Sequence, residues 1–154
     1  MYIRTIKGIV LFIVLSIAVA GCNSTTEEDG TIEESNSFPE FVYASSHPGS
    51  EAAYQYATDH GEYLDYIPCY CNCYVEPFEH QNVKDCFINN EYSTKEQQVY
   101  DPHGSGCGIC IETALDVQQM KEEGLPLSEI RDAIDAEYSK YAEPTDTPYP
   151  PEGM

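Results

Sequence analysis

Six cysteines and two histidines are concentrated in the middle of the chain. Residues 68–73 read PCYCNC, Cys86 stands alone, and residues 107–110 read CGIC. His80 lies between the first two groups and His103 just before the third. Thiolate and imidazole are ligands that suit Cu(I) and Zn(II). The candidate metal ligands are therefore Cys69, Cys71, Cys73, Cys86, Cys107, Cys110, His80 and His103.

The spacing of these cysteines indicates how they would meet. A CxxC at a helix start lets both sulfurs reach one ion, and the helix N-terminus favours the thiolate. A turn through residues 70–72 would bring the CxCxC sulfurs to one site, and Asn72 suits it because Asn tolerates the left-handed conformation. One structural zinc needs four ligands. The six cysteines and two histidines therefore predict either a multinuclear thiolate cluster or one metal site beside a redox pair.

Two other interpretations of the same cysteines stay open. Three disulfides would staple a small exported domain, with Cys69, Cys71 and Cys73 pairing with Cys86, Cys107 and Cys110 in an order that sequence cannot choose. A thiol oxidoreductase centred on Cys107 and Cys110 is the third interpretation, although the βαβ pattern of a thioredoxin-like domain is missing.

The elements that must position these residues are expected to be mostly helical. A helix is predicted over 50–60 with Ser50 as N-cap, and a second from about Cys107 to Glu123, closed by Gly124. Ser128 is expected to cap a third helix that packs against the second as an antiparallel αα-hairpin. A short helix over 81–89 would turn Val83, Cys86 and Phe87 inward. The fold class is thus a small, mostly α domain with a cysteine-rich loop region.

The N-terminus carries an export signal. Arg4 and Lys7 precede an apolar run that ends in Val19-Ala20-Gly21-Cys22, which predicts a signal peptide over 1–21. This ending resembles a bacterial lipobox, so Cys22 is the expected lipidation site. Residues 22–40 would form an acidic flexible tether, 41–142 the cysteine-rich domain and 143–154 a disordered Pro-rich tail. We expect a protein anchored by lipid to the cell membrane and facing the extracellular side.

Charge and composition exclude several functions. The 154 residues contain 27 Asp and Glu against seven Lys and Arg, a formal charge of −20, which argues against nucleic-acid binding. Gly-rich phosphate loops, GxSxG elbows and HExxH helices are missing from the sequence, so an enzyme is the less favoured interpretation. His47 and His60 are not placed in the site. A protein partner cannot be named from the sequence.

The string PCYCNC resembles the motif of the PCYCGC-motif lipoproteins, a family from Gram-positive bacteria with no established activity. The similarity spans roughly 41–141, and Asn72 stands where the family motif has Gly. Asn is a common substitute for Gly at positive φ, so the turn should survive. The resemblance implies the domain and its location but supplies no reaction. It continues through His80, Cys86-Phe87, Asp101-Pro102-His103-Gly104, Cys107, Cys110, Ile130-Arg131, Ile134-Asp135 and Tyr138.

Overall fold

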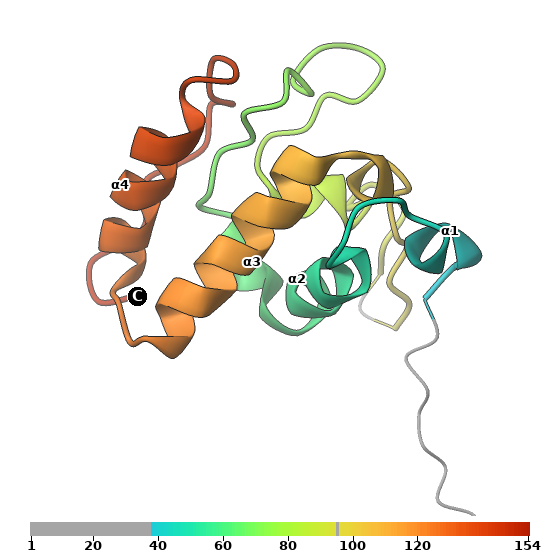
Figure 1. The fold of residues 1–154 in the computed structure, drawn as a ribbon, viewed down its shortest axis with the longest axis horizontal. Coiled ribbons are helices and arrows are strands. Elements are labelled where there is room, and N and C mark those ends of the chain that lie inside the picture. The colour runs from blue at the N-terminus through green and yellow to red at the C-terminus, as the bar shows by residue number, and fades with distance from the viewer. Residues whose placement is uncertain (1–37, 95) are drawn as a thin grey trace, which may run out of the picture. The chain divides into compact units, whose positions relative to one another are not determined.

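The computed structural model describes residues 38–94 and 96–154, which are mostly helical (Figure 1). This confirms the predicted fold class. Within these residues the only β-pairing is an isolated bridge between Ile88 and Tyr100. The elements are α1 (Glu40–Tyr43), α2 (Ser50–Leu64), the 3₁₀ turns η1 (Lys84–Cys86) and η2 (Gly104–Gly106), α3 (Gly108–Glu122) and α4 (Leu127–Tyr138).

The predicted signal peptide, the lipidation site Cys22 and most of the tether lie outside the described residues. None of the helices in the described part has the length and apolar character needed to cross a membrane. Phe38 is already buried in the core, and α1 begins at Glu40. The folded domain therefore begins before residue 41, which was the boundary predicted from the sequence.

Helix α3 has nearly the predicted bounds. It ends where expected, at Gly124 with φ 86°, and the backbone N–H groups of Gly124 and Leu125 donate to the carbonyls of Lys121 and Met120. These bonds satisfy the last carbonyls of the helix. The short 81–89 segment contains η1, with Val83, Cys86 and Phe87 buried as predicted.

Two details of the other helices differ from the prediction. Ser50 and Ser128 are not N-caps: α2 starts after Gly49 and α4 after Pro126, and neither helix has a side-chain cap. Helix α2 also extends to Leu64, with a kink at His60, where φ is −137° and ψ is 29°. A Cβ on Gly61 would lie 3.0 Å from Lys84 Cε, so this glycine allows close packing against the Lys84 side chain of η1.

Helix α3 packs against both α2 and α4 (Figure 1). Its buried face includes Ile111, Ala114 and Val117, and α4 contributes Ile130 and Ile134 to the same core. A four-residue connection, 123–126, joins α3 to α4. The antiparallel αα-hairpin geometry stays a prediction.

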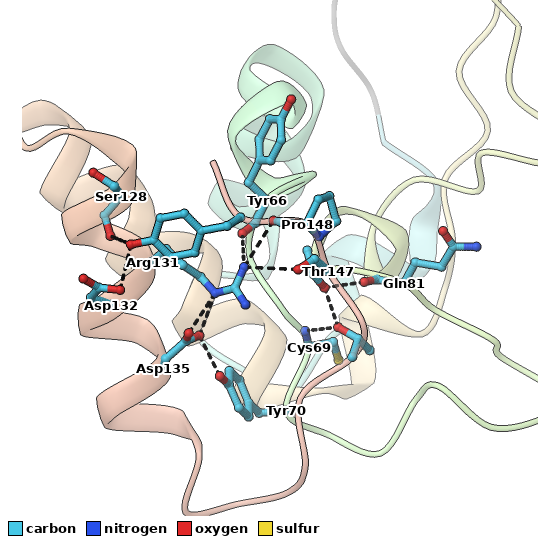
Figure 2. A network of polar contacts seen from close by, with 12 residues as sticks. Tyr66, Cys69, Tyr70, Gln81, Ser128, Arg131, Asp132, Asp135, Thr147 and Pro148 are labelled. Carbon is cyan, nitrogen blue, oxygen red and sulfur yellow. Dashed lines mark hydrogen bonds and ion pairs between the residues drawn. The ribbon is translucent and has the colours of Figure 1, made fainter. Parts of the chain in front are cut away.

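The C-terminal segment 143–154 is ordered against the domain, so the expectation of a disordered tail is wrong. Thr145, Thr147 and Pro150 are buried, and the segment runs back along α4 (Figures 1 and 2). At its end, Leu127 N donates to the carbonyl of Met154. The sequence offered few apolar residues to bury here, but backbone and hydroxyl hydrogen bonds hold the segment instead.

Thr145 connects this segment to the first cysteine of the motif. Cys69 N donates to Thr145 Oγ1 at 2.8 Å, and Thr145 N donates to the Cys69 carbonyl at 3.1 Å. Thr145 Oγ1 lies 2.8 Å from Thr147 Oγ1, and that hydroxyl donates to the carbonyl of Gln81. The backbone of Cys69 is thus fixed on both sides by a residue 76 positions away.

Arg131 on α4 fastens the same region (Figure 2). Its guanidinium donates to both carboxylate oxygens of Asp135 at 2.9 Å and to the carbonyls of Tyr66 at 2.9 Å and Pro148 at 3.3 Å. Asp135 also accepts from the Tyr70 hydroxyl at 2.6 Å. One charged side chain therefore connects α4, the chain entering PCYCNC and the C-terminal segment.

Thr145→Val tests the importance of this connection. The isosteric change leaves the buried Cys69 N–H without its acceptor, so the free energy of unfolding should fall by about 1–3 kcal/mol. Chemical denaturation followed by circular dichroism measures it. The control is Asp146→Asn, an exposed neighbour, which should change stability little. Equal stability of Thr145→Val and wild type would mean that the segment does not hold Cys69.

Candidate metal centre

The PCYCNC segment forms the predicted turn. Asn72 has φ 60°, the left-handed conformation that was inferred from its residue type. Beyond the turn, His80 N donates to the Cys73 carbonyl at 2.9 Å, which closes the loop 73–80. Before it, Val83 N donates to the Ile67 carbonyl at 2.9 Å and holds η1 beside the motif.

Four sulfurs from three segments form the first group of potential ligands: Cys69, Cys71, Cys86 and Cys110. All of their Sγ atoms lie within 4.8 Å of one another. Cys69 is 3.8 Å from Cys86 and 3.9 Å from Cys110, while Cys86 and Cys110 are 2.7 Å apart. Cys69, Cys86 and Cys110 are buried, and Cys71 is half-buried.

These distances suit four-coordinate binding after small adjustments. Zn–S bonds of about 2.3 Å place the sulfurs of a tetrahedral site ~3.8 Å apart. The separations from Cys69 to Cys86 and Cys110 already have this length, and Cys71 to Cys110 is 3.4 Å. The 2.9 Å between Cys69 and Cys71 and the 2.7 Å between Cys86 and Cys110 would have to widen. The four thiols could hold one metal ion.

Cys73, His80 and His103 form a second group, also within 4.8 Å. Cys73 Sγ lies 3.4 Å from His103 Nε2, and the two imidazole rings have centroids 5.0 Å apart. Cys73 and Cys71 have sulfurs 2.6 Å apart, so the two groups are adjacent. His103 Nδ1 is buried and has no hydrogen-bond partner among the described residues. Thiol and imidazole together could hold a second cation.

The loop that carries His103 is positioned by residues far from it. The Tyr54 hydroxyl on α2 donates to the Asp101 carbonyl and accepts from Ser105 N at 3.0 Å. Asp101 Oδ1 accepts from His103 N at 2.8 Å, which forms an Asx turn. A Cβ on Gly104 would lie 2.5 Å from the Cys86 carbonyl, so only glycine allows this loop to approach η1.

Neither Tyr54 nor Thr145 could be recognised from the sequence as a residue that supports the site. Both act through partners far along the chain, at Asp101 and Ser105 for Tyr54 and at Cys69 for Thr145. Tyr54 occupies a buried helix position like any core residue. No spacing or motif distinguishes such a residue before the fold is known.

The thiols differ in acidity because they hydrogen bond to one another. Hydrogen bonds from neighbouring thiols, Cys110 foremost, lower the pKa of Cys69, and a bond to Cys110 lowers that of Cys107 to about 3. Burial raises the pKa of Cys86, and the bond to Cys107 raises that of Cys110. The hydrogen bond with Cys69 raises the pKa of Cys73 to about 12. The thiols of the cluster therefore differ in acidity according to their burial and their sulfur neighbours.

His80 is suited to bind a metal through a neutral ring. Burial lowers its pKa, and the neighbouring His103 acts in the same direction. A neutral imidazole keeps the lone pair that a ligand needs. His80 Nδ1 lies 3.5 Å from Cys86 Sγ, so this ring contacts both groups of candidate ligands.

Seven of the eight predicted ligands fall into these two groups. Cys107 is the exception: it is a half-buried free thiol at the N-cap of α3 and hydrogen bonds to Cys110 and Cys71, but lies in neither group. His47 is half-buried and His60 exposed, and both lie outside the two groups. All six cysteines of the described residues are free thiols.

A comparison of this sequence with known protein families finds a match to a family that is defined by its cysteine motif. The chain matches the family described as "Protein of unknown function with PCYCGC motif" over residues 11–150. It belongs to this family, as its motif had indicated. Comparisons with curated proteins and with solved structures gave no match.

Asn72 offers a test of the turn itself. Asn72→Gly should be tolerated, whereas Asn72→Ala should be less stable than Asn72→Gly by about 1 kcal/mol, because a Cβ disfavours positive φ. Urea denaturation of both variants measures the difference. The pair is matched, since both remove the amide. An alanine variant more stable than the glycine variant would contradict the left-handed conformation.

Proposed function

We propose that this protein is a lipid-anchored, extracytoplasmic protein that binds a soft metal, copper(I) or zinc, through its cysteine cluster. The observation that carries this proposal is the convergence of thiols from the PCYCNC turn, η1 and α3, with two histidines beside them. Copper(I) is preferred on thiolate density alone. Soft cations would allow these buried sulfurs to be ionised together.

The lipid anchor follows from the sequence signals at residues 1–22. A lipid-modified Cys22 would hold the acidic domain at the extracellular face of the membrane, with the intervening residues as a tether. Radiolabelled fatty acid incorporation in the native host, compared between wild type and Cys22→Ser, tests this part separately. Equal labelling of the two proteins would overturn the anchor and leave the metal-binding proposal standing.

A disulfide-stapled interaction module is the alternative from a different class. Pairs that it could use are close in space, since the Cys69 and Cys86 sulfurs are 3.8 Å apart and those of Cys71 and Cys110 3.4 Å. Free thiols and the adjoining histidines favour metal binding over this alternative. A thiol oxidoreductase has less support, because Cys110 belongs to a four-thiol group that does not include Cys107, so the two do not form an isolated dithiol.

Native mass spectrometry of the protein purified anaerobically from its host separates these functions. Metal binding predicts copper or zinc at whole-number stoichiometry and thiols recovered after chelation. Three disulfides instead predict a metal-free mass lower by about six protons, and a large loss of thermal stability on reduction. The latter result would overturn the proposal.

Cys71→Ser/Cys73→Ser should lower the metal content without unfolding the helices. Cys71 is only half-buried, and although Cys73 belongs to the buried core, the helices contribute their own apolar residues to that core, such as Ala57, Ala114 and Ile130. Elemental analysis gives the metal content, and circular dichroism gives the helical content as the control. Unchanged metal stoichiometry in a folded double variant would contradict these ligands.

A further inference from the structure

We infer that the centre holds two metal ions in two chemically different sites, one with four sulfur ligands and one with a sulfur and two nitrogens. This inference rests on the proposed metal binding and adds its stoichiometry and ligand sets. The first site is Cys69, Cys71, Cys86 and Cys110, and the second is Cys73, His80 and His103.

Geometry divides the ligands in this way. The atoms of each group lie within 4.8 Å of one another, close enough for one ion. The first group has the four donors of a closed tetrahedral site, and the second has the three protein donors typical of a site that keeps a position open. His103 Nε2 lies 3.4 Å from Cys73 Sγ, so this ring nitrogen faces the other ligand atoms of the second group.

Charge explains why the two sites belong together. A divalent ion with four thiolates carries a net charge of −2, whereas one with a single thiolate and two neutral imidazoles carries +1. No basic residue of the described part offsets the first charge: Lys84, Arg131 and Lys140 pair with carboxylates, and Lys121 lies over the Tyr63 ring. The adjacent second ion would supply the missing positive charge.

One ligand of the second site, His80, also lines a surface recess. A recess of about 460 Å³ is lined by Phe78, His80 and the acidic residues Glu79, Asp85, Glu91 and Asp101. Phe78 packs against His103 with ring centroids 4.1 Å apart, and its side chain is half exposed. Carboxylates along this recess would concentrate cations next to His80. The ion of the second site should therefore exchange faster than the ion held by four sulfurs.

Zinc titration of the metal-free, reduced protein tests the two sites. We expect two zinc ions per chain in wild type and one in His80→Asn/His103→Asn. His47→Asn/His60→Asn is the matched control and should retain two, because these histidines lie outside both groups. A chelator added in steps should remove one ion of wild type well before the other, and this early step should disappear in His80→Asn/His103→Asn.

X-ray absorption of the two-zinc wild-type protein provides a test that needs no variant to fold. Five sulfurs and two nitrogens shared by two ions should be found. One ion per chain, or a double-histidine variant that still binds two, would overturn the two-site inference while the proposed function stands. The absence of any bound zinc or copper(I) would overturn the proposed function itself.

Discussion

The structure depends on bringing thiols from three separate chain segments together in the protein interior. Cys69 and Cys71 come from a turn, Cys86 from a 3₁₀ turn and Cys110 from the first turn of α3. Closing the intervening loops costs conformational entropy, so each segment needs its own fixed contacts. The Ile67–Val83 and Cys69–Thr145 backbone bonds supply these contacts at the motif, and Gly104 allows the third segment to approach.

Elements with local signals could be predicted from the sequence, and those with distant partners could not. Helix α3, its end at Gly124 and the left-handed Asn72 all follow from residue preferences that act within a few positions. The ordered C-terminal segment depends on Thr145 meeting Cys69 and Arg131 reaching two carbonyls, contacts that span many residues. Ser50 and Ser128 show the converse: both are good capping residues, but Ser50 lies one position after the N-cap of α2 and Ser128 two positions after the N-cap of α4.

The candidate ligands could be predicted from the sequence as one set, but their division between the two groups could not. Counting cysteines and histidines in the sequence identifies all members of both groups, because thiol and imidazole are conspicuous by type. Their distribution depends on the turn at Asn72, which leaves Cys71 with Cys69 and places Cys73 beside His103. A CxxC pair in sequence likewise suggests a shared ion, whereas the structure groups Cys110, but not Cys107, with the other sulfurs.

Burial of the sulfurs also determines what could stabilise them. The core around the cluster is apolar, with Ile67, Phe87 and Ile111 buried close to the cysteines in sequence, and all four described basic side chains are engaged elsewhere. Ionised thiolates in such surroundings repel one another and lose hydration. A bound cation removes both costs at once. The fold therefore provides an environment in which several thiolates are stable together when a metal ion holds them, and in which burial lowers the pKa of the neighbouring His80.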